Sequence, residues 1–211
     1  MRLDERKESI LDFIVRDYVR TACPVSSFKV SEGKGLDLSP ASIRNIMLEL
    51  DEEGLLHQPH TSAGRAPTEK GYKYFVDNLM EEKNVPESAK ADFDKIFSEF
   101  FGESMFDELA SLMAHRLKLF SGIVSNGRTF KSGFAEVLRE PEFKEHDFLV
   151  EFAEFAENIE DNIENFEGIK IGEFSIVSSK FGSNHIVFSM GPARMDYEKV
   201  SSFIKYLTKS L

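Results

Sequence analysis

The sequence predicts an α+β protein in which a helical N-terminal part precedes a larger, helix-rich part with a small antiparallel sheet. Apolar residues recur three or four positions apart through most of the chain, which is the spacing of amphipathic helices. Three stretches, 119–124, 171–179 and 185–190, are instead rich in Val, Ile and Phe and are bounded by turn-forming residues, as strands are. With 211 residues, of which 41% are hydrophobic and 30% charged, the chain can form one or two globular domains.

Two helices are expected near the N-terminus. Asp4 is a suitable N-cap for a first helix that continues to about Arg20. Its apolar stripe should face a core and consists of Ile10, Leu11, Ile14, Val15, Tyr18 and Val19. Ser26 or Ser27 can cap a second, shorter helix that ends near Glu32, before a glycine-containing turn.

A third helix is predicted from residue 39 to residue 53. Ser39 is a good N-cap, and Pro40 suits the first helical position because its missing N–H has no partner there in any case. Gly54 can adopt the left-handed conformation that ends a helix. One face of this helix is apolar and consists of Ile43, Ile46, Met47 and Leu50.

The stretch that follows the third helix predicts a short strand, a polar loop and another helix. Residues 55–58 form an extended run, and residues 60–67 form a loop in which Gly64 precedes Arg65. Thr68 can cap the last helix, whose apolar residues are Tyr72, Phe75, Val76 and Leu79. This order is typical of a winged helix, a helix-turn-helix variant with a β loop, and we assign residues 1–80 to such a domain.

Polar residues on the third helix suggest a DNA-reading surface. Ser42, Arg44 and Asn45 lie in its first turns, away from the apolar face, where a recognition helix contacts base edges. Asn can pair with adenine and Arg with guanine, whereas Arg65 on the loop could enter a minor groove or contact phosphate. An ordinary surface helix and loop would show the same pattern. Two further cations could contact phosphate or simply be solvated, namely Lys29 and Lys34.

The second part of the chain is expected to be a separate domain at 89–211, after a charged, proline-containing linker at 81–88. Helices are predicted from Ala89 to about Gly102, from Ser104 onward, from Asp147 to about Phe166, and from Tyr197 onward. The helix at 147–166 has an acidic face that we interpret as solvated. Most of the 20 phenylalanines follow residue 90, and some of their rings are expected to lie between subunits.

Charge is distributed unevenly along the chain. The net charge is −11, but the first 80 residues contain 11 Lys or Arg and 13 Asp or Glu, so that most of the acidity lies beyond them. This distribution argues against a protein that coats DNA nonspecifically. It is compatible with site-specific binding, because phosphate contact needs a local positive surface rather than a positive protein.

No catalytic, cofactor or metal site is predicted. The five histidines are dispersed, and the single cysteine, Cys23, excludes an intrachain disulfide and is expected to be at least partly buried. His60 at the base of the loop is expected to touch DNA or cap the loop rather than bind metal. No P-loop, dinucleotide-binding or nucleophile-elbow motif is found. Without an apolar signal core or a membrane span, the protein is expected to be cytoplasmic and without a membrane partner.

Residue identity adds a family resemblance. The runs Leu38–Asn45, Glu53–Leu56 and Gln58–Arg65 resemble the N-terminal domain of the heat-inducible transcription repressor HrcA family, and Pro67-Thr68, Gly71-Tyr72 and Phe75-Val76-Asp77 continue the similarity. The run from Gln58 to Arg65 is the most specific of these, because eight successive residues of uncommon combination match the family.

The resemblance implies a repressor of heat-shock (chaperone) genes. Family members bind an inverted-repeat DNA operator, called CIRCE, as homodimers until heat stress releases them, and the chaperonin is a partner that helps keep them active. The DNA-contacting residues expected here are Ser42, Arg44, Asn45 and Arg65. Further backbone, loop or DNA contacts are expected from Ser39, His60, Thr61 and Ser62.

The C-terminal part departs from the family pattern. Family members are longer, and their C-terminal part is GAF-like with an inserted dimerisation segment. In this sequence, residues 126–128 lead almost directly to residues 133–138, so that much of the central sheet and the insert is expected to be absent. A reduced GAF-like dimerisation or regulatory domain is therefore expected at 89–211. The alternative function is a winged-helix regulator whose GAF-like domain responds to a small ligand or protein effector instead of heat.

Overall fold

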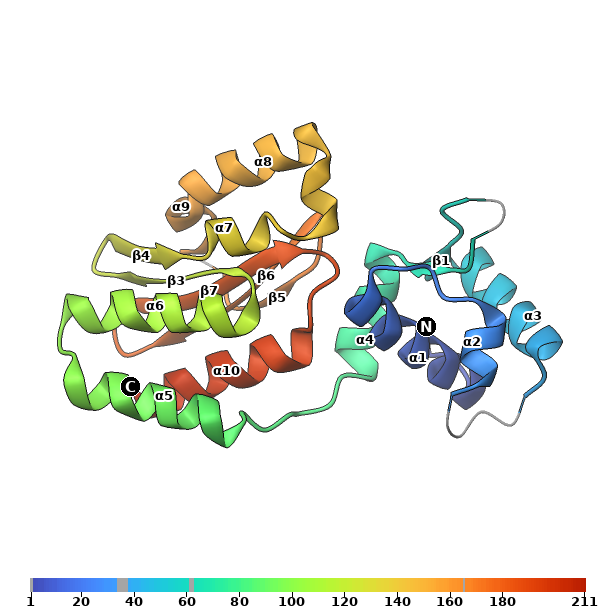
Figure 1. The fold of residues 1–211 in the computed structure, drawn as a ribbon, viewed down its shortest axis with the longest axis horizontal. Helices are drawn as coiled ribbons and strands as arrows, with labels where there is room; N and C mark the ends of the chain where they lie inside the picture. Colours follow the sequence, from blue (N-terminus) through green and yellow to red (C-terminus); the bar gives the residue numbers. More distant parts are fainter. Residues whose placement is uncertain (1, 34–37, 61–62, 165) are drawn as a thin grey trace. The chain divides into compact units, whose positions relative to one another are not determined.

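A computed structural model describes residues 2–33, 38–60, 63–164 and 166–211 of the chain, which divides into two compact units (Figure 1). Unit 1 is Met1–Glu81, and unit 2 is Glu82–Leu211. The helices and strands of unit 1 are α1 (Glu5–Thr21), α2 (Ser27–Ser31), α3 (Pro40–Glu52), β1 (Leu56–His57), β2 (Ala66–Pro67) and α4 (Glu69–Asn78). The helices and the first short strand follow the order predicted for the N-terminal part, whereas β2 lies in the stretch that was predicted to be a loop.

Side-chain caps begin the helices of unit 1 where the sequence places them. The Asp4 carboxylate accepts hydrogen bonds from the backbone N–H groups of Arg6 and Lys7, each at 3.0 Å. The hydroxyls of Ser39 and Thr68 each accept a hydrogen bond of 3.1 Å from the N–H three residues later. Such caps typically contribute about 1 kcal/mol each, and they fix the starting residue of each helix.

The core of unit 1 forms between α1, α2, α3 and the hairpin. Val30 and Leu56 are buried there, and so are most residues of the predicted apolar stripes, whereas Tyr18, Val19 and Ile46 of those stripes are only half-buried. The fully or almost fully buried stripe residues include Ile10, Leu11, Ile14, Val15, Ile43, Met47, Leu50 and Phe75. Each such side chain contributes roughly 1.5–3 kcal/mol through its removal from water. Cys23 is exposed, which corrects the expectation of partial burial, because it follows the left-handed Ala22 that ends α1 at the surface.

The β1–β2 hairpin is antiparallel and is attached to the segment before α2. Leu56 pairs with Pro67, and His57 pairs with Ala66. Two backbone hydrogen bonds of 2.8 Å also join Val25 to Arg65. A Cβ atom at Gly64 would lie 2.1 Å from the Val25 carbonyl oxygen, so this close approach requires glycine.

Unit 2 contains a five-stranded antiparallel sheet with the order β4-β3-β7-β6-β5. Its strands are β3 (Phe120–Ser125), β4 (Arg128–Ser132), β5 (Gly168–Lys170), β6 (Phe174–Phe181) and β7 (His185–Pro192). The sequence predicted only β3, β6 and β7. The two additional strands lie at the edges, where β4 is polar and only half-buried and β5 has three residues, so neither has the apolar run of a central strand.

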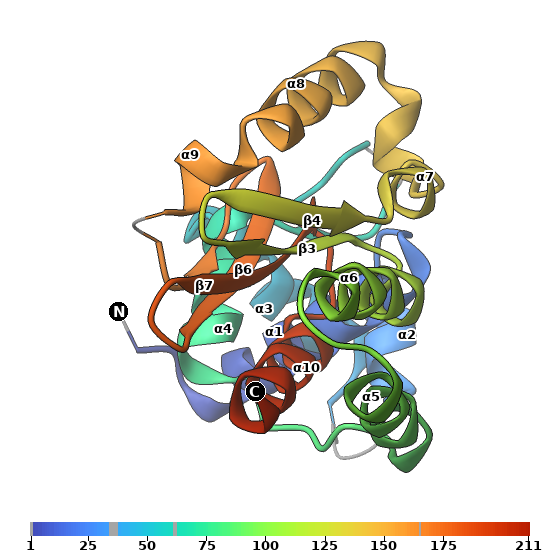
Figure 2. The same cartoon turned by 90° about the vertical axis from the view of Figure 1, so that its left-hand side faces the viewer.

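Helices cover both faces of this sheet (Figure 2). On one side lie α5 (Glu87–Glu99), α6 (Glu103–Leu117) and α10 (Tyr197–Ser210), and on the other lie α7 (Phe134–Val137), α8 (His146–Glu157) and α9 (Ile159–Ile163). A short 3₁₀ turn, η1 (Pro141–Lys144), precedes α8. In the described part of the chain, no helix combines the length and apolar character needed to cross a bilayer.

The single long helix predicted from Asp147 to Phe166 is wrong, because the chain breaks at Asn158 between α8 and α9. Asn158 has φ −103° and ψ 31°, outside helical values. Its side-chain amide donates to the Glu154 carbonyl at 2.9 Å, and the Asn162 amide donates to the Asn158 carbonyl at 2.9 Å. Asparagine side chains compete in this way with the helical backbone bonds. Phe152 before the break and Ile159 and Ile163 after it still pack into one core cluster with residues of the sheet.

Phenylalanine rings form much of the core between the sheet and α8. Phe152 is fully buried and meets the Phe143 ring edge-to-face, with 4.8 Å between centroids. Phe174 makes a similar contact with Phe155 at 4.9 Å. Phe101 is 76% exposed, in contrast. The rings thus serve mainly the interior of unit 2, and the expectation that some lie between subunits stays a prediction.

The segment predicted as a linker is packed at its unit 2 end. Val85 is 5% exposed. The Lys83 ammonium lies 2.6 Å from the carboxylate of Glu198, which is 2% exposed, and Glu82 pairs with Lys205 of α10. Residues 82–85 therefore belong structurally to unit 2.

Candidate nucleic-acid interface

One side of α3 is directed to solvent along its whole length. At about 100° of rotation per residue, Ala41, Arg44, Asn45, Leu48 and Glu52 lie on this side, and all five are exposed. We call these five residues the outward face of α3. Within the described residues, neither Arg44 nor Asn45 has a hydrogen-bond or ion-pair partner. Both side chains are therefore available to an external ligand.

Ser39 and Ser42 are tied to the start of α3. The Ser39 hydroxyl accepts a hydrogen bond of 3.1 Å from the Ser42 N–H, and the two hydroxyl oxygens are 3.0 Å apart. Both residues are exposed, although Ser42 lies on the flank of the helix and not on the outward face. Their first role is to cap the helix, and whether either also contacts DNA stays a prediction.

Three cations hold the opposite end of α3. Arg65 Nε lies 2.7 Å from Asp51 Oδ2, and Lys70 donates to the Glu53 carbonyl at 2.6 Å. Lys7 of α1 reaches Glu49 at 2.9 Å and Glu53 at 2.7 Å, and its hydrogen bonds to these carboxylates raise the Lys7 pKa. Positive charge near a helix C-terminus is favourable because it opposes the helix dipole. These contacts fix the direction of α3 while leaving the outward face of its N-terminal half exposed.

Arg65 is placed differently from the solvent-directed loop arginine that the sequence suggested. Its side chain is only 12% exposed and lies against Asp51. The Nε–H bond is not aligned for a hydrogen bond, so the contact is an ion pair. Together with its two backbone bonds to Val25, this makes Arg65 a brace between the hairpin, α3 and the segment before α2. A contact between Arg65 and DNA stays a prediction.

The loop of the hairpin closes through its own hydrogen bonds. The Ala63 N–H donates to the His60 carbonyl at 2.8 Å, and the Gln58 amide donates to the Ala63 carbonyl at 2.9 Å. His60 is exposed at one end of this turn. Thr61 and Ser62, which were predicted to contact DNA, lie outside the described residues.

A groove of about 420 Å³ separates the start of α2, α3 and the hairpin. It is lined by Ser26, Ser27, Arg44, Met47, Leu48, Gln58, Ala63, Gly64 and Arg65. Sequence reasoning did not single out Leu48, which is 45% exposed and lines this groove from α3. Its spacing would have identified it, since Leu48 follows Arg44 by four residues and Asn45 by three.

Of the two lysines predicted as possible phosphate contacts, Lys29 and Lys34, only Lys29 lies among the described residues. Lys29 lies 2.6 Å from the Asp17 carboxylate, whose side chain is 5% exposed. Burial alone would raise the Asp17 pKa, but hydrogen bonds from Lys29 and Arg20 outweigh it and hold the pKa below its ordinary value of 3.8. Lys29 therefore ties α2 to α1, and Lys34 lies outside the described residues.

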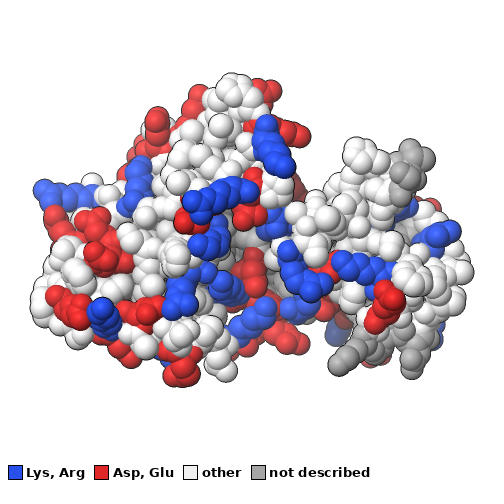
Figure 3. All heavy atoms as spheres, in the orientation of Figure 1, with Lys and Arg blue, Asp and Glu red and all other residues white. Residues whose placement is uncertain are grey.

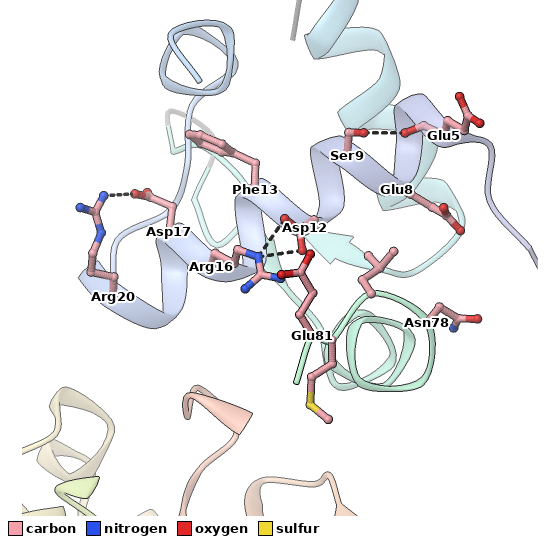
Figure 4. A pocket seen from close by; sticks show the side chains of 12 residues that line it. Glu5, Glu8, Ser9, Asp12, Phe13, Arg16, Asp17, Arg20, Asn78 and Glu81 are labelled. Atoms are coloured by element: carbon pink, nitrogen blue, oxygen red, sulfur yellow. Dashed lines mark hydrogen bonds and ion pairs between the residues drawn. The ribbon is translucent and has the colours of Figure 1, made fainter. Parts of the chain in front are cut away.

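A larger depression on unit 1 lies between α1 and the end of α4 (Figure 4). Arg16 contacts both carboxylate oxygens of Asp12 at 2.8 and 2.9 Å, and Arg20 pairs with Asp17 at 2.7 Å. Both arginines of the lining are thus paired, and the remaining charged residues there, Glu5, Glu8 and Glu81, are acidic, so the depression does not suit an anion. Among the described residues, no three His, Cys, Asp or Glu side chains converge to hold a metal ion.

Charged groups are distributed differently over the two units on the face drawn in Figure 3. Much of the unit 1 surface near α3 and the hairpin is uncharged, with separate basic groups, whereas acidic groups gather over α8 and around α5 and α6 of unit 2. This agrees with the uneven distribution of charge along the sequence.

Comparison with known proteins relates the chain to proteins that are named as transcription repressors. The family model described as the HrcA protein C terminal domain matches residues 74–201. The heat-inducible transcription repressor HrcA of Desulfitobacterium hafniense is 42% identical over 121 residues, which are 57% of this chain and 34% of that protein. The HrcA of Desulforudis audaxviator is 53% identical over 90 residues, or 43% of this chain and 26% of that protein. The match thus spans about a third or less of these relatives.

A solved structure, described as the crystal structure of a hypothetical protein at 2.2 Å resolution, shares the fold over both chains. It covers 99% of this chain and 97% of its own, with a TM-score of 0.80 and 18% sequence identity. The family match covers more than half of the present chain, and the named relatives are all heat-inducible repressors. The chain therefore belongs to the HrcA family.

Proposed function

We propose that the protein is a sequence-specific DNA-binding transcriptional repressor of heat-shock (chaperone) genes that binds an inverted-repeat operator as a homodimer. The observation that carries this proposal is the outward face of α3, where Arg44 and Asn45 are exposed and have no partner among the described residues, while the other end of the helix is held by three cations. A preorganised helix with open polar side chains loses little conformational entropy on binding.

In this proposal, unit 1 is a winged helix-turn-helix domain. The N-terminal half of α3 enters the major groove, where Arg44 can donate two hydrogen bonds to guanine and Asn45 can pair with adenine. The hairpin lies beside it, with His60 at its tip and the backbone of Val25 as a third extended segment. The tip then reaches an adjacent minor groove or the phosphates.

Affinity for DNA tests this proposal directly. The full-length chain is titrated against a duplex with an inverted repeat and against a scrambled duplex of the same composition. Arg44→Ala and Asn45→Ala should weaken binding to the repeat and reduce the preference for it. Lys73→Ala is the matched control, because Lys73 is an exposed cation on α4, away from α3, and its loss removes the same charge. Equal binding to both duplexes would contradict the proposal.

For unit 2 we propose the dimerisation and regulatory role of a reduced GAF-like domain. In such a dimer, two copies of unit 1 related by a two-fold axis would contact the two half-sites of an inverted repeat. We propose heat as the release signal, supported by the names of the relatives. Operator footprints at rising temperature, with and without added chaperonin, test this, and release that needs a small molecule at constant temperature would favour the ligand-responsive alternative.

A further inference from the structure

We propose, on the basis of the proposed function, that Leu48 reads the 5-methyl group of a thymine in the major groove of the operator. Leu48 is a large apolar side chain that is 45% exposed on the outward face of α3. Its polar neighbours on this face are Arg44, one turn earlier, Asn45, three residues earlier, and Glu52, one turn later. A single exposed apolar residue is common on protein surfaces, but Leu48 directly follows two proposed base-reading side chains on the same face, where it can contact a base edge.

The core of unit 1 makes no use of Leu48. Ile43 and Leu50 of the same helix are fully buried, and Met47 is 4% exposed, so the opposite side of α3 already completes the packing. Leu48 instead forms part of the rim of the groove of about 420 Å³ between α3 and the hairpin. The other exposed apolar residue of the outward face is Ala41, at the start of the helix.

The reach of α3 fits the spacing of bases. From Ala41 to Leu48 the helix rises roughly 10 Å, at about 1.5 Å per residue, which equals about three base-pair steps of about 3.4 Å each. Glu52 follows on the same face, and its carboxylate would be repelled by phosphates. The contacting part of the helix therefore ends near Leu48, within two or three base pairs of the position that Arg44 reads.

The major groove presents one apolar substituent, the C5-methyl group of thymine. The other groups on the base edges are hydrogen-bond donors and acceptors, which the Leu48 side chain cannot satisfy. Burial of one methyl group against Leu48 corresponds to about a fourfold gain in affinity, or roughly fifteenfold for two half-sites. Leu48 is thus a specificity residue for thymine, beside the hydrogen-bonding residues Arg44 and Asn45.

The test removes the methyl group without changing any base pair. An inverted-repeat operator is first selected with the full-length chain from a pool of random duplexes. Each symmetric pair of thymines is then replaced in turn by deoxyuridine, and the affinity is measured by fluorescence anisotropy. For the unmodified chain, we expect one pair of positions at which deoxyuridine weakens binding by roughly fifteenfold.

Three variants separate the methyl contact from DNA binding in general. Leu48→Ala should abolish the difference between thymine and deoxyuridine at that position, whereas Leu48→Met should retain it. Arg44→Ala should weaken binding to every operator duplex of the series, with thymine or with deoxyuridine, but leave the preference for thymine intact. Thermal melts of the variants should match the unmodified chain, because the substituted side chains are exposed.

Two results would overturn the inference while leaving DNA binding intact. One is an unmodified chain that binds every deoxyuridine duplex as tightly as its thymine counterpart. The other is a Leu48→Ala variant that keeps the full preference. Failure of the chain to prefer the selected repeat over a scrambled duplex is a different result, seen before any thymine is replaced, and it overturns the proposed function together with this inference.

Discussion

Arg44 and Arg65 were both expected to contact DNA, but their surroundings differ. Arg44 is exposed on the outward face of α3 and has no partner among the described residues, whereas Arg65 is 12% exposed beside Asp51. An arginine that already has an intramolecular partner must exchange it to bind phosphate, which reduces the gain. The two residues therefore lead to opposite expectations for folding and binding.

Arg44→Ala should weaken operator binding by about 1–3 kcal/mol if the guanidinium pairs with guanine. The free energy of unfolding should be unchanged, since no described contact of Arg44 is lost. The measurement compares binding titrations with thermal melts of the same preparations. A variant that loses stability in parallel with affinity would indicate that Arg44 has a packing role instead.

Arg65→Ala should destabilise the folded chain by roughly 1 kcal/mol, because it leaves the Asp51 carboxylate without its ion-pair partner. Denaturant unfolding of Arg65→Ala, Asp51→Ala and the double variant forms a cycle that isolates the pair. Additive single effects would show that the ion pair does not stabilise the fold. Reduced operator affinity for Arg65→Ala, with unchanged affinity for Asp51→Ala, would support a direct DNA contact by Arg65.

At the scale of elements, local sequence signals identified the helices more completely than the strands. The caps at Asp4, Ser39 and Thr68 act within three residues, so the sequence alone could predict them. The pairing of Val25 with Arg65 joins residues 40 positions apart, and no local pattern announces it. Strand β4 was missed because its pairing with β3 at the sheet edge leaves no apolar run in the sequence. The break at Asn158 was missed because it depends on a competition between a side-chain hydrogen bond and the helical backbone bonds.

Gly64→Ala should destabilise the hairpin. The added Cβ atom would lie 2.1 Å from the Val25 carbonyl oxygen. Its three nearest atoms all belong to the backbone of Val25 and Ser26, so the hairpin would have to move away from this segment. We expect a loss of about 1–3 kcal/mol in the free energy of unfolding, with weaker operator binding because the hairpin shifts. Gly172→Ala is the control, since its nearest neighbour would lie at 3.5 Å. Equal thermal midpoints for the two variants would contradict the assigned packing.

The tie between α1 and α2 should depend on pH. Lys29 and Arg20 hold the pKa of Asp17 below its ordinary value of 3.8, so the folded state binds this proton less readily than the unfolded state does. The stabilising contribution is present above about pH 4 and is lost as the pH falls below it. Unfolding measured across this range should show a shallower acid dependence for Asp17→Asn. Identical slopes for the two proteins would show that Asp17 is not linked to folding.

At the scale of the whole molecule, a division into two units was predictable, but the packing at their boundary was not. The uneven distribution of charge and the change of pattern near residue 81 indicated two parts. The packing of residues 82–85 against α10 was not foreseen, because it depends on the ion pair of Lys83 with Glu198, which is 2% exposed. The residues that could contact DNA came from residue identity, whereas the roles of Arg65 and Leu48 needed the three-dimensional arrangement.

A dimer is expected in solution if unit 2 performs the proposed dimerisation. Phe101, which is 76% exposed, is one apolar group available for such a contact. Size-exclusion chromatography with light scattering at micromolar concentration should give about twice the mass of the chain, which is 24.0 kDa. A monomer under these conditions would contradict the dimeric form of the repressor.

Preference for an inverted repeat is the measurement that tests the central claim most directly. The purified full-length chain is titrated at moderate ionic strength against an inverted-repeat duplex selected by the chain and against a scrambled duplex of identical length and composition. We expect markedly tighter binding to the repeat, and a reduced preference in Arg44→Ala. Equal affinity for the two duplexes would contradict a DNA-reading role for α3.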